Sequence, residues 1–168
     1  TGNFGNILSA YYAKCMGAPI GRLICASNRN DVLTEFLRTG VYDRNRPFYT
    51  TMSPSMDILI SSNLERLLYA LSDGNDAEVR SYMKQLNAEG RYQVSDTVLA
   101  KVRKLFWAGS CGEEDTMDTI RRYYTQRNYL MDTHTAVAAH VLEQYRAESG
   151  DGGPAVIVST ASPYKFCS

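Results

Sequence analysis

The sequence has few of the residues that commonly build metal sites. It contains two histidines and four cysteines in 168 residues, and no two cysteines form a C-x-x-C pair. His134 and His140 are six residues apart on an expected helix, so they face in different directions, and no carboxylate or thiol stands at ligand spacing. We therefore expect no metal site, and we expect His134 to cap a helix or anchor a loop.

An excess of charge of either sign is also missing. Eighteen basic residues balance eighteen acidic ones, so the sequence predicts neither a nucleic-acid nor a membrane partner. No apolar run approaches the ~20 residues of a membrane-spanning helix, and no secretory signal is present. The cysteine spacing is typical of reduced thiols, which favours a cytoplasmic location.

Two common catalytic motifs are absent as well. There is no G-x-S-x-G elbow and no G-x-x-x-x-G-K-[ST] loop, which disfavours hydrolase and P-loop functions. Four lysines are expected on solvated helix faces: Lys14, Lys84, Lys101 and Lys104. Lys165 follows an expected strand, where α/β domains collect ligand contacts, but an exposed tail lysine explains it equally well.

A turn of small residues, Thr1-Gly2-Asn3-Phe4-Gly5-Asn6, leads directly into an amphipathic stretch expected to be helical over 6–16. Backbone N–H groups at such a turn and at a helix N-terminus point the same way and can bind a phosphate. Glycine permits the close approach and the positive φ that such a turn requires. An ordinary tight loop remains the alternative.

The sequence begins at this turn, without an initiator methionine or a preceding strand. In a βα unit a phosphate-binding turn follows a strand. We therefore expect the chain to be part of a longer protein.

The first third of the sequence predicts alternating helices and strands. Apolar residues within 20–26 suit a buried parallel strand, and a helix over 31–39 is expected to be capped by Asn30. Residues 42–55 are expected to form a loop, and β-branched residues over 155–159 predict a second buried strand.

The middle of the chain is expected to be helical. A capping box from Ser62 to Glu65 predicts a helix over 63–71, and Asp76 is expected to cap the next. From 95 nearly to 149 the pattern is helical, with Asp132 or Thr133 capping the last piece. Together these elements predict a three-layer α/β domain with a small, mostly parallel sheet flanked by helices and a helix-rich second half.

Several stretches together resemble threonine synthase of the microbial and fungal subgroup. They are TGNFGNILSAYYAKCMGAPIGRLICASN, NDVLTEFLRTGVYDRNRPFYTTMSPSMDILISSNLERLL, DTHTAVA and VIVSTASPYKF. The resemblance runs along essentially the whole chain. It implies an enzyme that uses pyridoxal phosphate to convert O-phosphohomoserine and water to threonine and phosphate.

The resemblance also implies a tryptophan-synthase-β-like fold of type II and a set of cofactor contacts. Thr160 would meet the pyridine nitrogen of the cofactor, with Ser159 as the less favoured neighbour. A neutral hydroxyl there would leave that nitrogen largely unprotonated. The cofactor phosphate would lie in the glycine turn, held mainly by backbone N–H groups of Gly2, Asn3, Phe4, Gly5 and Asn6.

Contacts to the substrate are expected from small polar residues and cations. Asn63 is explained equally well as a helix cap, as is Ser62. Arg44 is a further anion contact by charge alone. Ser162 replaces the usual histidine of the family motif and Tyr164 replaces a small residue, which leaves the local geometry open. The residues expected on the substrate side are Ser53, Ser55, Asn63 and Lys165.

In this family the lysine that binds the cofactor as a Schiff base lies upstream of the glycine turn. The resemblance therefore implies that this chain is a C-terminal portion with a helical insertion at about 63–149, inactive without the N-terminal half of the protein. Gly5→Ala is expected to abolish cofactor retention in the complete protein. Two alternatives stay open: a threonine-synthase-like phospholyase, and a non-catalytic ligand-binding module.

Overall fold

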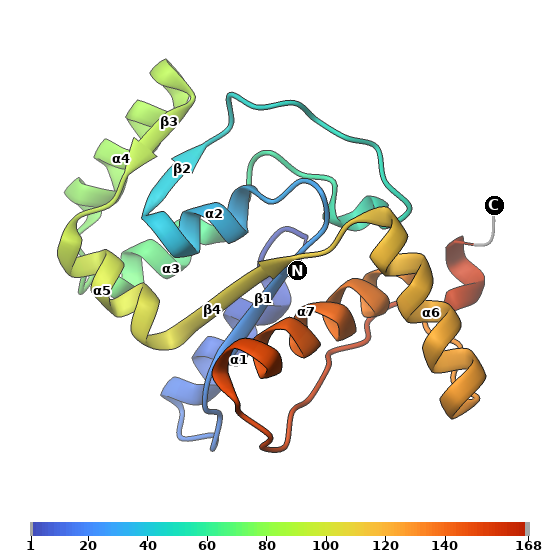
Figure 1. Ribbon diagram of the computed structural model, residues 1–168. Coiled ribbons are helices and arrows are strands. Elements are labelled where there is room, and N and C mark those ends of the chain that lie inside the picture. Colours follow the sequence, from blue (N-terminus) through green and yellow to red (C-terminus); the bar gives the residue numbers. More distant parts are fainter. Residues whose placement is uncertain (1, 167–168) are drawn as a thin grey trace.

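The computed structural model describes residues 2–166 and is built around a two-stranded parallel sheet. Strand β1 (Leu23–Ser27) pairs with β4 (Phe106–Ser110), with Leu23 opposite Phe106 and Ser27 opposite Ser110. Both strands cross the centre of the molecule in Figure 1. The predicted strand within 20–26 is confirmed as β1.

Helices cover both faces of this sheet. On one face Leu23 and Cys25 join the main hydrophobic core, and on the other Ala26 packs against Val137 and Val141 of α7. The predicted three-layer α/β arrangement is confirmed. The helices that contribute to the main core are α1 (Gly5–Cys15), α2 (Val32–Thr39), α3 (Leu64–Leu71), α4 (Asp76–Glu89) and α5 (Asp96–Leu105).

A short antiparallel ribbon lies beside α2 and α4. Strands β2 (Val41–Asp43) and β3 (Arg91–Gln93) pair with Tyr42 opposite Tyr92, and the two rings stack with centroids 5.3 Å apart. The ribbon closes one end of the core, away from α6 and α7 (Figure 1).

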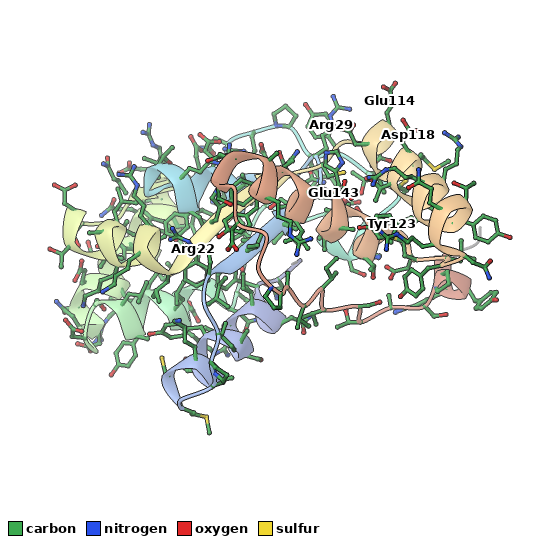
Figure 2. The ribbon with its side chains drawn as sticks, turned by 60° about the horizontal axis from the view of Figure 1, so that its bottom comes forward. Arg22, Arg29, Glu114, Asp118, Tyr123 and Glu143 are labelled. Carbon is green, nitrogen blue, oxygen red and sulfur yellow. The ribbon has the colours of Figure 1, made fainter. Side chains whose placement is uncertain are left out.

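The last two long helices pack along each other. Glu143 of α7 (Thr133–Ser149) accepts hydrogen bonds from Arg122 at 2.8 and 2.7 Å and from the Tyr123 hydroxyl at 3.3 Å, both on α6 (Glu113–Arg127). Figure 2 labels Tyr123 and Glu143 where the two helices meet. Two 3₁₀ turns, η1 (Pro54–Met56) and η2 (Pro163–Phe166), complete the fold.

Two predictions about strands are wrong. The expected run of helices from 95 to 149 is interrupted by β4, which continues directly from α5 without a glycine or proline to mark the change. The expected strand at 155–159 is extended but belongs to no sheet among residues 2–166. A strand needs a neighbour for its backbone hydrogen bonds, and neither β1 nor β4 pairs with this segment.

Three predicted caps are also wrong. Asn75, not Asp76, caps α4 by accepting from the amide of Glu78. The side chain of Asn30 bonds to Tyr49 instead of α2, and the Ser62 hydroxyl accepts from Asn3 instead of capping α3. Asp132 is confirmed as the cap of α7.

The expected helical insertion at about 63–149 contains β4, half of the central sheet, so that range is not purely helical. Where domain boundaries fall stays a prediction. Across residues 2–166, none of the helices combines the length and apolarity that crossing a membrane requires.

Candidate functional site

A pocket of about 910 Å³ opens beside the N-terminus of α1. Its walls come from the glycine turn, the segment between β2 and α3, the start of α7 and the extended segment after α7. Most of the residues predicted to form a site line it: Gly2, Asn3, Gly5, Asn6, Ser55, Asn63, Thr160 and Lys165. Thr1 lies outside the described residues.

The N-terminus of α1 differs from those of α4, α5 and α7. Asn75, Ser95 and Asp132 cap those three helices with their side chains, whereas α1 has no side-chain cap and no acidic residue in its first turn. The first N–H groups of a helix have no partner within the helix, and its dipole favours negative charge there. The start of α1 thus has the features that favour an anion, and its residues Gly5 and Asn6 line the pocket.

The turn before α1 has the backbone shape of a cradle. Gly2 has φ +42° and Phe4 has φ 66°, so both lie in the left-handed region. A Cβ on Gly2 would overlap the carbonyl oxygen of Ser55. The side chain of Phe4 is fully buried with its ring centroid 5.8 Å from that of Phe106. Phe4, predicted as a cofactor contact, therefore anchors the turn in the core and is not among the residues that line the pocket.

Asn3 clamps the turn to the start of α3. Its side chain donates to the Ser62 hydroxyl and accepts from the Ser62 amide, each at 2.7 Å. Asn63 donates to the Asn3 carbonyl at 2.9 Å. The side chain of Asn3 is thus occupied in positioning, and Asn63, expected on the substrate side, holds the cradle as well.

His134 holds the loop that contains Ser55. Its Nε2 accepts from the Ser55 amide at 3.1 Å, so Nδ1 carries the proton and donates to Asp132 at 3.1 Å. Burial lowers the pKa of His134 and outweighs the opposing effect of Asp132. The lowered pKa keeps the ring neutral. The loop-anchoring interpretation of His134 agrees with this geometry.

Two other predicted contacts lie away from the pocket. Ser53 is fully buried, and its hydroxyl contacts Asn28 at 3.0 Å in a polar cluster with Thr51. Arg44 is not among the lining residues, and its backbone amide donates to the Gly90 carbonyl. Neither side chain is placed to contact a ligand in this pocket.

The C-terminal motif also borders the pocket. Thr160 and Lys165 line the pocket, while Ser162 accepts from the amide of Tyr164 at 3.4 Å. Tyr164 is 82% exposed. Ser162, in place of the histidine expected from the resemblance, thus acts at the start of η2.

No local spacing predicts one further cluster, because His140 comes from α7 whereas Cys111 and Asp115 lie before and within α6. Ligand atoms of Cys111, Asp115 and His140 lie within 4.8 Å of one another. The Cys111 thiol contacts Thr116 and the Gly112 carbonyl, and burial raises its pKa to about 11. The thiol is therefore protonated and satisfied within the protein.

Comparisons with known proteins give a consistent result, although no protein-family model matches. The chain is 42% identical over 167 residues to human threonine synthase-like 1 and 39% identical over 180 residues to the threonine synthase of Saccharomyces cerevisiae. Both alignments cover 99% of this chain but 22% and 35% of the relatives, so the chain spans about a third or less of their length.

Solved structures agree. A threonine synthase from Brucella melitensis with bound PLP matches with a TM-score of 0.91 at 41% identity, and the yeast enzyme with 0.92 at 39%. Each match covers 99% of this chain and 35% of the other.

Proposed function

We propose that this chain supplies the cofactor-phosphate cradle of an enzyme that converts O-phosphohomoserine and water to threonine and phosphate. Nearly its whole length is homologous to one segment of the threonine synthases. The observation that carries the proposal is the uncapped, acid-free N-terminus of α1, which opens on a pocket of about 910 Å³.

The residues present fit pyridoxal phosphate. A phosphate would lie against the N–H groups of the turn and the first turn of α1, where the backbone is held by Phe4 and Asn3. Thr160 lines the same pocket and offers a hydroxyl for the pyridine nitrogen. When bound, the cofactor supplies a sink for the negative charge that develops next to the substrate amine.

The chain's own residues would bind and orient the substrate. Ser55 and Asn63 bring polar groups to the pocket, and Lys165 brings a positive charge to it. An ammonium group at this place suits the phosphate that the substrate loses. Ser53 lies away from this pocket and packs against Asn28.

The lysine that binds the cofactor covalently is proposed to lie outside this chain. Lys14 donates to the Gly21 carbonyl at 3.0 Å, and Lys101 forms an ion pair with Asp73 at 2.8 Å, so both are engaged elsewhere. The chain on its own is therefore expected to be inactive and to need the N-terminal half of the protein.

The test is turnover by the full-length protein supplied with pyridoxal phosphate and O-phosphohomoserine. We expect equal amounts of threonine and phosphate, and after borohydride reduction no cofactor attached to any lysine of these 168 residues. Absence of threonine would refute the reaction, and a labelled Lys165 would refute the placement of the lysine.

A second candidate function is a phospholyase. The observation that favours it is the C-terminal motif, where Ser162 replaces the histidine of the family pattern and Tyr164 replaces a small residue. The same assay separates the two functions by their products. A phospholyase would eliminate phosphate without adding water at Cβ, so it would give phosphate, a 2-oxo acid and ammonia instead of threonine. A non-catalytic module would retain no pyridoxal phosphate on purification.

A further inference from the structure

The extended segment after α7 turns back along that helix in both views (Figures 1 and 2). Ile157 packs on the cluster of Met131, Ala136 and Ala139, and the Ser159 hydroxyl lies 2.9 Å from that of Thr135 on α7. Thr160, next in the chain, lines the pocket, whereas Ser159 is not among the lining residues.

Behind Thr135 stands the buried carboxylate of Asp132. One of its oxygens accepts from the amide of His134 at 2.9 Å and that of Thr135 at 3.2 Å, and the other accepts from the Thr135 hydroxyl. Burial alone would raise the pKa of Asp132, but the hydrogen bonds from Thr135 and His134 outweigh it and lower the pKa. Asp132 is thus an ionised group that only accepts.

Thr135 joins the segment to this carboxylate. Its hydroxyl is the donor toward both the Asp132 carboxylate and the Ser159 oxygen, so its one proton is shared between them. The Ser159 hydroxyl is thus held against α7. Of the two neighbouring hydroxyl residues, Thr160 is the one that lines the pocket.

We propose that Asp132, acting through Thr135 and Ser159, is a positioning residue that holds the Thr160 hydroxyl toward the pocket as the donor to the pyridine nitrogen. Among residues 155–161 this contact is the one side-chain hydrogen bond that ties the segment to α7. The nitrogen would then accept a hydrogen bond from the Thr160 hydroxyl and stay unprotonated. The part concerning the cofactor rests on the proposed function, and the anchoring of the segment does not.

The experiment compares Thr135→Val, which has no hydroxyl, with Thr135→Ser, which keeps it, in the full-length protein. Thr116→Val is the matched control, because Thr116 is as deeply buried and its hydroxyl bonds within α6 to the Gly112 carbonyl. Hydrogen exchange of residues 155–161 is measured without cofactor. The ¹⁵N shift of labelled pyridoxal phosphate and the pH dependence of its absorbance are measured with it.

We expect Thr135→Val and Ser159→Ala to speed exchange roughly tenfold, the effect of one lost hydrogen bond, and Thr135→Ser and Thr116→Val to leave it unchanged. Thr135→Val should also move the ring-nitrogen signal in the direction of Thr160→Val. Exchange and nitrogen signal like wild type in Thr135→Val would overturn the proposal, as would equal effects of Thr116→Val. If Thr135→Val speeds exchange but the wild-type protein binds no cofactor, the anchoring of the segment by Thr135 and Ser159 would stand. Its link to the pyridine nitrogen would then be refuted, together with the proposed function.

Discussion

At the scale of single residues, the two glycines of the turn have different roles. Gly2 has a positive φ and no space for a side chain, because a Cβ would overlap the Ser55 carbonyl. Gly5 is helical, and a Cβ there would lie 3.7 Å from the Asn63 amide nitrogen, an ordinary contact. A substitution at Gly2 therefore tests the backbone shape of the turn, whereas a substitution at Gly5 tests the space that a ligand needs.

Gly2→Ala is expected to destabilise the full-length protein by about 1–2 kcal/mol or more, since it adds left-handed strain to a clash with backbone. Gly5→Ala should leave the fold intact and still lose the cofactor, because its methyl group meets the phosphate. Urea unfolding and the cofactor content after dialysis check the two effects. Full cofactor content in Gly5→Ala would show that the phosphate lies elsewhere.

His134 and Asp132 give the stability a pH dependence. The pKa of each is lower in the folded protein than in the unfolded chain, so both contribute stability above their unfolded pKa values and lose it as the pH falls through the folded values. We expect the melting temperature to fall as the pH drops below about 6.5, the ordinary pKa of histidine. His134→Gln, whose amide oxygen can still accept from Ser55, should remove the first part of that fall. An unchanged pH profile in this variant would contradict it.

At the scale of elements, the start of α1 presents a conflict between stability and binding. Asn6→Asp places a carboxylate in the first turn, where it should stabilise the helix by about 0.3–1 kcal/mol. The same charge should repel a phosphate, so affinity for pyridoxal phosphate should fall while the melting temperature holds or rises. Asn6→Ala is the control, because it removes the amide without adding charge. A similar loss of affinity in both variants would mean that the Asn6 side chain itself is the contact.

The accuracy of the sequence predictions also varied by element. β1 was predicted because four apolar residues stand between turn signals, whereas β4 was missed because Phe106 continues the helical spacing of Val98, Val102 and Leu105. Residues 155–159 have strand propensity, but propensity describes how well side chains fit a sheet. It does not supply a neighbouring strand with which to pair.

The same difference separates the predicted from the missed parts of the site. The glycine turn could be found because its signal is local and its residues are consecutive. The bonds from Asn3 to Ser62 and from Thr135 to Ser159 join residues 59 and 24 positions apart, and no local pattern encodes them. Ser62 is predicted to be a helix cap because serine is common at helix N-caps in general.

At the scale of the whole molecule, the segment after α7 carries exposed apolar side chains. Val156 is 91% exposed and Val158 is 58% exposed, both beside the pocket. If the N-terminal half of the protein covers this side, the isolated chain should self-associate. Light scattering on the chain and on the full-length protein measures this. Val156→Thr with Val158→Thr should reduce association of the isolated chain, whereas Met117→Thr on α6 should not. Association that ignores all three changes would place the contact elsewhere.

The clamp between Asn3 and Ser62 also has a consequence for the order of events during synthesis. Closing a loop of this length costs entropy that only later contacts recover, so the cradle cannot be rigid until α3 has been made and docked. A ribosome would have to release some sixty further residues after the glycine turn before that turn could grip a phosphate. The cofactor would then bind late in folding, after α3 has docked, and would not nucleate folding.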